Sequence, residues 1–437
     1  MSNSNPFTTP ATLGSIILKT AEGAAIDIAL LVKEINVYES LFHNFVTASV
    51  TIVDTPQTRL LQQGLKTALD EISFSFGGLK INRSPEKPLK LSLYVYKTEM
   101  RAMETNQTAQ SMVIHLAPKC MFFNSTKDIS RYFSGKITNN VKKLAKELQI
   151  SLNDIEVSDS EMRGIYSYKS PFELINMFAA RCRPSRNKND VNYIFYQTID
   201  NRYHFRSIGS LLETRSRVGV DSKSGYQVQM PFDLSSVELK QNVLSHDSSS
   251  QSPYKNATSG MLTSSVQTFD MTTKTYTETG YSYDTEFSKQ THLSKKKITD
   301  SSQYELFSEL VGGTFLSRYT QKGRYAMTCK DPVESQDKVG GPDDWLLKRI
   351  SLMQQITQMS LLFTVPGTSE NVSVGDTFYF GRPIQQQLSQ HNKEKDILNN
   401  GKFLATEVRH CLKYNQGAVA AEYTTIIKGI KDSIGDE

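Results

Sequence analysis

Apolar and polar residues alternate along the first quarter of the chain with the two-residue period of half-buried β-strands. Four segments between residues 12 and 117 carry this pattern. Their apolar positions are Val46, Ala48, Val50 and Ile52; Ile72, Phe74 and Phe76; Leu91, Leu93 and Val95; and Met112, Ile114 and Leu116. Short strands separated by turn residues favour a small barrel or sandwich, so we predict a β-barrel over residues 1–118.

The pattern becomes helical after residue 118. Val141, Leu144, Ala145 and Leu148 have the spacing of one buried helix face, which predicts a helix over 138–148. A second helix begins at the capping box of residues 170–173, with proline at its first helical position, and ends before residue 184. Two strands over 193–199 and 203–208 complete a predicted α/β module, residues 119–225.

Serine and threonine dominate residues 246–275, which favours a loop or locally disordered chain. Residues 276–283 could form an extended strand. A long helix is predicted from Pro342, because Asp343 and Asp344 suit the positive end of a helix dipole. Its apolar stripe from Trp345 to Met359 is interpreted as core in preference to an exposed partner surface, although it could contribute to a subunit interface. Residues 246–362 are therefore predicted to be a Ser/Thr-rich insertion bearing a helix.

Strand patterns return at 377–380, 403–414 and 419–427, and they resemble the first β region. Residues 98–101 (Thr-Glu-Met-Arg) match 406–409 (Thr-Glu-Val-Arg), and Glu71 and Asn106 match Asp376 and Asn415, in the same order and at nearly constant spacing. The pattern predicts a duplicated barrel, whose second copy comprises residues 226–245 and 363–437. The alternative is that two unrelated hairpins share common turn residues. The predicted fold class is α+β, predominantly β, with two similar barrels separated by the α/β module and the insertion.

Composition narrows the class of protein. The chain has 437 residues, which favours roughly three domains. Its net charge of +5 argues against a protein that coats nucleic acid. The cysteines Cys120, Cys182, Cys329 and Cys411 lack metal-ligand spacing and favour a reducing compartment. No signal peptide or bilayer-spanning apolar run is visible. We therefore expect a soluble chain, synthesised in a cytoplasm, without stable membrane insertion.

Catalytic motifs are absent from the sequence. The seven histidines (His43, His115, His204, His246, His292, His391 and His410) are scattered, and His115 and His410 are interpreted as hydrogen-bonded structural residues within strands. A hydrolase triad using His246 and Asp247 is disfavoured, because sequence neighbours seldom form one. The basic run 181–188 lacks interleaved aromatic residues and favours a polar protein contact or a solvated loop over nucleic-acid binding. We predict no catalytic residue, no cofactor-binding residue, no metal ligand and no enzymatic activity.

The order of these elements resembles the central baseplate hub protein of contractile-tailed bacteriophages, from about Asn36 to Lys428. The segments that carry the resemblance are Phe45–Asp54 followed by Leu60 and Leu61, the strand Leu69–Phe76, Ile114–Pro118 leading to the helix around Val141, the helix start Ser170–Glu173, the strands of Val372–Phe380, and the hairpin Phe403–Lys428. No single diagnostic motif is involved.

The resemblance implies a homotrimer in which each chain contributes two tube-like β-barrels to a pseudo-sixfold ring. Such a ring joins a sixfold tail tube to a threefold spike and leaves a channel through which DNA passes without specific binding. The implied partners are the tail spike protein, the tail tube or tube-initiator protein and baseplate wedge proteins, with the tape measure protein as a further candidate. The implied location is the tail baseplate of the virion, after synthesis in the cytoplasm of a bacterial host.

Two other interpretations remain open. The chain could be the similar base of a type VI secretion-like injection spike, although the barrel and β-helix that commonly follow in those proteins are not predicted here. It could also be a tail-associated cell-wall hydrolase or a carbohydrate-binding protein, which would need two suitably separated carboxylates in a cleft if it acted as a glycosidase. Residues 246–302 and 382–401 are extra to the resemblance and have no assigned role.

Overall fold

The structure is a computed structural model of the whole chain. It describes residues 9–54, 70–78, 88–102, 110–228, 241–250, 252, 255–256, 259–270, 274–299, 317–319, 342–368, 370–382, 398–414 and 421–435. Leu60, Leu61, Asn106 and Asn415, which entered the sequence comparisons, lie outside these residues, as does most of the 382–401 segment.

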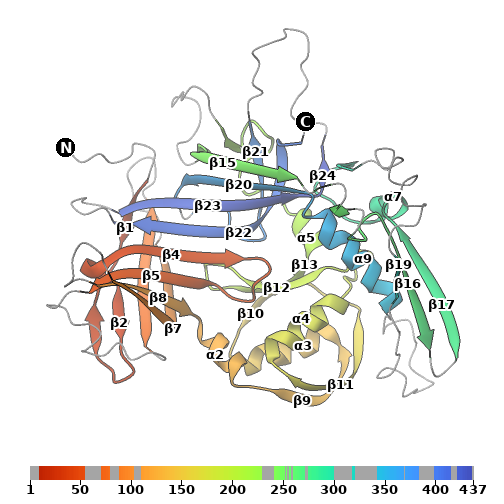
Figure 1. Ribbon diagram of the computed structural model, residues 1–437, viewed down its shortest axis with the longest axis horizontal. Coiled ribbons are helices and arrows are strands. Elements are labelled where there is room, and N and C mark those ends of the chain that lie inside the picture. Colours follow the sequence, from red (N-terminus) through yellow and green to blue (C-terminus); the bar gives the residue numbers. More distant parts are fainter. Residues whose placement is uncertain are drawn as a thin grey trace, which may run out of the picture.

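The protein is α+β and predominantly β, as its sequence predicts, and a sheet of 14 strands forms its largest part (Figure 1). Within this sheet two groups of strands have the same order. The first strand set is β4 (Val32–Ser40), β5 (Thr47–Asp54), β8 (Gln110–Ala117), β7 (Leu89–Ala102) and β6 (Glu71–Gly78). The second strand set is β15 (Ser245–Ser250), β20 (Met359–Pro366), β23 (Ala421–Lys431), β22 (Gly401–Lys413) and β21 (Thr377–Gly381). Neighbouring strands are antiparallel throughout both sets.

Two links join the sets into a closed circuit of paired strands. β1 (Thr9–Leu13) pairs with β6 on one side and β23 on the other, and β22 pairs with β4. The circuit therefore runs β4–β5–β8–β7–β6–β1–β23–β22 and back to β4, so the second set's long hairpin closes a ring that consists mainly of first-set strands. Three short strands, β2 (Ile17–Lys19), β3 (Ala25–Asp27) and β14 (Tyr226–Gln227), extend the sheet, and the 3-10 turn η1 (Ala29–Leu31) precedes β4.

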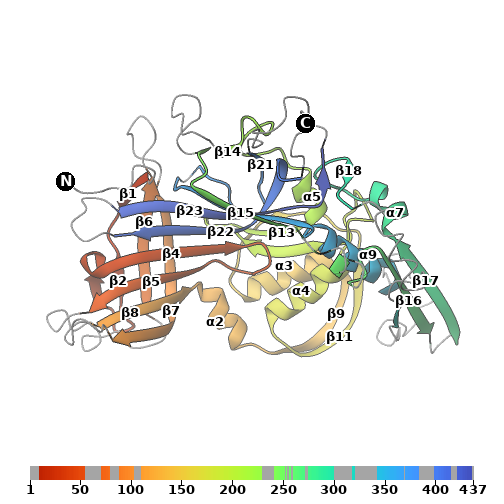
Figure 2. The ribbon, with the colours of Figure 1, turned by 45° about the horizontal axis from the view of Figure 1, so that its top comes forward.

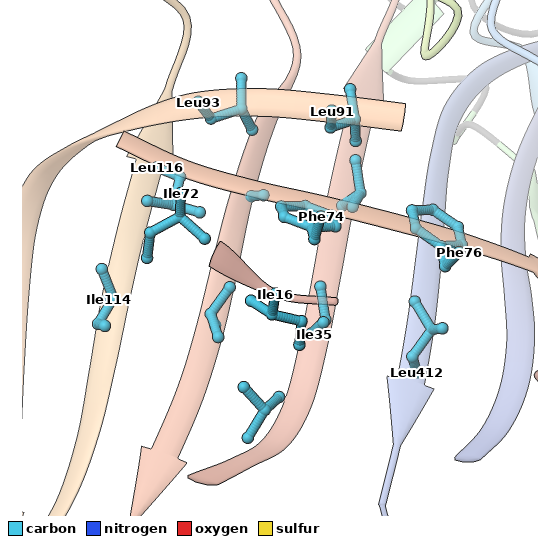
Figure 3. Close-up of a cluster of buried hydrophobic side chains, with 14 of the residues drawn as sticks. Ile16, Ile35, Ile72, Phe74, Phe76, Leu91, Leu93, Ile114, Leu116 and Leu412 are labelled. Carbon is cyan, nitrogen blue, oxygen red and sulfur yellow. The ribbon is translucent and has the colours of Figure 1, made fainter. Parts of the chain in front are cut away.

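Every apolar position that the alternating pattern assigned to the first β region is buried, which confirms those strand faces. Figure 3 shows Phe74, Phe76, Leu91 and Leu93 pointing into one cluster, and Leu412 of β22 joins them. Full burial of one such side chain stabilises a fold by about 1.5–3 kcal/mol. The core of the first set thus includes a side chain from the far end of the sequence.

Most of the α/β module lies below the sheet in Figure 1. Its elements are α2 (Lys119–Ser125), β9 (Ile129–Lys136), α3 (Ile137–Glu147), β10 (Leu152–Ile155), β11 (Glu161–Lys169), α4 (Pro171–Arg181), β12 (Tyr193–Gln197), β13 (Tyr203–Ser207) and α5 (Ile208–Leu212). The predicted helix face of α3 is buried, and the predicted capping box of α4 is present, with Glu173 Oε2 accepting from the Ser170 amide at 2.9 Å. These helix predictions are confirmed.

The Ser/Thr-rich segment contains strands where the sequence predicted a loop. β15 pairs with β20 along its whole length, and β16 (Thr263–Asp270) pairs with β17 (Thr275–Ser282) to form what we name the arm. The loop prediction is wrong for these residues, because backbone pairing holds strands that bury few side chains, and β-branched threonine in β16 and β17 is suited to it. The strand predicted at 276–283 is confirmed as β17. The domain boundaries that the sequence analysis predicts at residues 246 and 363 fall inside β15 and β20.

The predicted helix from Pro342 is present as α9 (Pro342–Gln355), which packs beside the arm (Figure 2). It is shorter than the apolar stripe, since Met359 is already the first residue of β20. Leu352 and Met359 are buried, whereas Trp345 is half-buried. The interpretation of the apolar stripe as core is therefore confirmed for Leu352 and Met359. The remaining elements are α7 (Tyr283–Glu286), η3 (Phe287–Lys289), β18 (Lys296–Lys297), β19 (Ser317–Tyr319) and β24 (Ser433–Ile434).

Candidate functional site: the junction of the two strand sets

The two strand sets share a local irregularity as well as a strand order. The pairing of β7 with β8 shifts register between Val95 and Lys97, and the pairing of β22 with β23 shifts between Ala405 and Glu407. At each bulge the same backbone hydrogen bond forms: the Val95 amide donates to the Asp70 carbonyl and the Ala405 amide to the Asp376 carbonyl, both at 2.9 Å. A bulge is a specific local feature of a sheet, so this shared bulge relates the two sets residue by residue.

The bulges correct the residue alignment made from sequence. They place Tyr96 in the position of Thr406, so Thr98 corresponds to Val408 and not to Thr406. Asp376 corresponds to Asp70 and not to Glu71. Thr98 was misaligned by two residues because side chains alternate between the two faces of a strand, so a shift of two residues leaves every side chain on its own face.

The two sets differ in their outer strands. Ile35 and Val37 of β4 lie opposite Val50 and Ala48 of β5 and are buried. On β15 the corresponding positions, opposite Phe363 and Leu361, are His246 and Ser248. One set therefore ends in an apolar strand that is covered on both edges, and the other ends in a polar strand. Among the described residues, β15 pairs along its length with β20 alone.

A buried polar cluster lies where the sets meet the α/β module. The Glu39 side chain of β4 is 0% exposed and receives hydrogen bonds from His410 Nε2 at 3.1 Å, the Ile199 amide at 2.9 Å and the Ser373 hydroxyl at 2.5 Å. The other imidazole nitrogen of His410, Nδ1, lies 2.7 Å from the Tyr423 hydroxyl. A buried carboxylate is costly unless its oxygens are satisfied, and here both are. The cluster fastens β4, β22, β23, the turn after β12 and the loop before β21 to one another.

The structural role predicted for His410 is confirmed by these contacts. Glu39 was missed from sequence, although a signal was present. Ile35, Val37 and Glu39 follow one another at alternate positions, which puts the carboxylate on the buried face of the strand. An acidic residue at an inward position of a strand indicates a buried polar partner.

Other residues considered from sequence are dispersed. His246 and Asp247 are consecutive in β15, so their side chains leave opposite faces and do not converge on a common reactive group. In the basic run 181–188, Arg181 donates to the Tyr166 hydroxyl at 2.7 Å, and Arg186 forms an ion pair with Glu213. Part of the positive charge of the run is therefore balanced within the chain. Burial raises the pKa of the Cys120 thiol to about 11 and of the Cys182 thiol to about 12. Such thiols are poor nucleophiles.

The described ranges offer no candidate metal site and no candidate membrane span. No group of three or more His, Cys, Asp or Glu side chains there is placed to hold a metal ion. None of the helices in that part of the chain combines the length and apolar character that crossing a bilayer requires. Cys329 and His391 lie outside the described residues.

Comparison with solved structures identifies the fold. A tail protein from Neisseria meningitidis superposes with a TM-score of 0.51 at 8% identity, over 96% of this chain and 96% of that one. The 43 kDa tail protein of prophage MuSo2 from Shewanella oneidensis also gives 0.51, at 9% identity, over 96% of this chain and 100% of that one. The chain has the fold of a prophage tail protein. This is the fold that the sequence resemblance implied.

Another solved structure is less similar to this chain. The Francisella PdpA-VgrG complex gives a TM-score of 0.46 at 10% identity, over 98% of this chain and 54% of that chain. No protein-family model matches the sequence. No curated protein matches it.

Proposed function

We propose that the chain is the central hub of a phage tail baseplate, a homotrimer whose six strand sets form a pseudo-sixfold ring. The observation that carries the proposal is the repeat of strand order and bulge within one chain. Two similar units in each of three chains provide six similar docking edges, which a threefold assembly needs in order to meet a sixfold tube. The shared fold of the two tail proteins supports the same assignment.

In this proposal each strand set is a tube-type β-barrel, and barrels of neighbouring chains meet along the outer strands. β15 is the strand best suited to an intersubunit contact, because it is polar and pairs on one edge with β20. Pairing between chains would also cover the β15 edge that has no partner among the described residues, and an unpaired edge is prone to aggregation. The tail spike, tail tube or tube-initiator and wedge proteins are the proposed partners, and DNA passes through the channel without specific binding.

Mass measurement in solution tests this assignment. We expect light scattering of the purified chain to give three times the 49.2 kDa mass of one protomer, and the trimer to bind a purified tail tube or spike protein. A stable monomer that binds neither protein would contradict the hub function. We further propose that the chain has no lytic activity of its own, and loss of turbidity in a peptidoglycan suspension would overturn that part.

A further inference from the structure

The last residues of the second strand set are joined to the segment that returns from the arm. After β23 the chain continues into β24, which pairs with β18 so that Lys296 lies opposite Ile434 and Lys297 opposite Ser433. The Leu293 amide donates to Asp432 Oδ1 at 3.2 Å, and the Ser294 amide donates to Ser433 Oγ at 2.7 Å. We name these paired stretches, residues 287–297 and 431–434, the C-terminal seam.

His292 lies at the centre of the seam. The side chains of His292 and Asp432 are 5% and 2% exposed, and His292 Nδ1 lies 2.8 Å from Asp432 Oδ2. The other ring nitrogen, Nε2, lies 2.8 Å from the Phe287 carbonyl oxygen. The imidazole also stacks on the Phe287 ring, with centroids 3.7 Å apart.

This geometry fixes the proton content of the ring. A carboxylate and a backbone carbonyl can only accept hydrogen bonds, whereas a neutral imidazole has one donor nitrogen and one acceptor nitrogen. Both contacts of His292 form together only when the ring carries two protons. Loss of either proton would turn a nitrogen lone pair toward an acceptor oxygen 2.8 Å away.

His204 and His410 also face carboxylates but do not have this requirement. His204 lies 3.5 Å from Asp154 and 3.2 Å from the Thr198 hydroxyl, and His410 contacts Glu39 and the Tyr423 hydroxyl. A hydroxyl can donate as well as accept, so a neutral ring satisfies both partners in each case. The carbonyl at the second nitrogen distinguishes His292.

The seam is coupled to the foot of the arm through Phe287. Its carbonyl oxygen accepts from His292, while its side chain packs in a buried cluster with residues of β16, β17 and α9. The members of this cluster are Met261, Leu262, Val266, Tyr281, Tyr283, Phe287 and Leu347. A shift of Phe287 would therefore disturb the packing that holds the arm against α9.

We propose that the C-terminal seam is a proton-operated clamp on the arm, which is closed while His292 carries two protons and opens when one is lost. The clamp opens as the pH rises, because deprotonation removes a hydrogen bond and the positive partner of Asp432. The proposal does not depend on the hub function, and a trimer measurement does not test it.

Several other titratable groups surround the seam. The titratable groups on the surrounding elements are Asp190, Glu213, Tyr283, Asp284, Glu286, Lys289, Lys297, Lys402 and Lys431. Asp190 accepts from the Thr291 amide and hydroxyl, Lys297 pairs with Asp284, and Lys289 pairs with Glu286. Lys402 donates to the carbonyls of Leu212 and Thr214. Asp190, Lys289, Lys297 and Lys402 thus have partners that do not depend on a second proton on an imidazole.

Hydrogen–deuterium exchange of the intact chain between pH 5.5 and 8.5 tests the clamp. After correction for the intrinsic pH dependence of exchange, we expect the amides of residues 287–297 to lose at least tenfold protection as the pH rises. The amides of β8 serve as an internal reference and should keep theirs. Constant protection of the seam across this range would overturn the proposal.

Two matched substitutions sharpen the test. A glutamine side chain cannot donate to both acceptors from the position of the ring, so His292→Gln should leave the seam unprotected at every pH. His204→Gln, which removes a histidine with a carboxylate and a hydroxyl partner, should leave the wild-type profile unchanged. Retention of that pH profile by His292→Gln would contradict the clamp. If His292→Gln does not fold, the wild-type profile alone decides.

Discussion

At the scale of single residues, Glu39 connects parts of the chain that are far apart in sequence. Its carboxylate accepts from Ile199, Ser373 and His410, which belong to the α/β module, the loop before β21 and β22. Without it, the Ile199 amide and His410 Nε2 would be left buried and unpaired. A buried donor that loses its acceptor pays the full cost of its desolvation.

We therefore predict that Glu39→Ala lowers the free energy of unfolding by about 1–3 kcal/mol for each buried donor that it leaves unpaired. The matched control is Glu407→Gln, which removes an exposed carboxylate that pairs with Lys428 and should cost no more than about 1 kcal/mol. Urea unfolding followed by circular dichroism measures both. Equal effects of the two substitutions would show that Glu39 does not hold the junction together.

At the scale of elements, the two strand sets fill equivalent cores with different side chains. Ile72 and Leu93 lie opposite each other in the first set, and Phe378 and Phe403 do so in the second. The position of Leu116, opposite the bulge, is occupied by Gly429 in the second set. A Cβ atom on Gly429 would lie 2.6 Å from the Phe378 ring, so the glycine makes room for the two larger aromatic side chains.

Gly429→Ala should consequently destabilise the second set by overpacking, at a cost of about 1–3 kcal/mol. Gly280→Ala is the control, since a Cβ at that strand position in the arm meets nothing within 4 Å. Thermal unfolding monitored by calorimetry compares the two. An unchanged transition for Gly429→Ala would mean that Phe378 moves aside at little cost.

The sequence predicted the elements unevenly, for physical reasons. Strands with one buried apolar face, such as β5 and β8, show a two-residue period and were predicted correctly. β15 and β16 were missed, because strands rich in serine and threonine are held mainly by backbone pairing and leave no hydrophobic period. Glu39 left a local trace in its strand, whereas His292 and Asp432 are separated by 140 positions and left none.

At the scale of the whole molecule, β1 closes the ring of strands. It lies between β6 and β23 and pairs with both through only a few residues, Thr9 to Leu13. Without it, the facing edges of β6 and β23 would be left unpaired over this stretch. Unpaired edges invite pairing with other chains.

Deletion of residues 1–14 should therefore leave a folded but aggregation-prone chain. We expect size-exclusion chromatography to show high-mass species that increase with concentration, while the full chain keeps a single peak. A deletion of residues 1–8 alone, which keeps β1, is the control. A truncated chain that stays monodisperse would indicate that β1 is dispensable for the ring.

The sequence by itself determined which faces of the strands in the first β region are buried, where α3 and α4 begin to within a residue or two, and that the chain is predominantly β. These properties follow from side-chain periodicity and capping residues, which act over a few neighbouring positions. Only the tertiary structure decided that β1 and the β22–β23 hairpin close the first set, how the bulges align the two sets, and which groups face His292. Periodicity specifies the face of a strand but not its partner, and partners here are chosen by contacts between residues hundreds of positions apart.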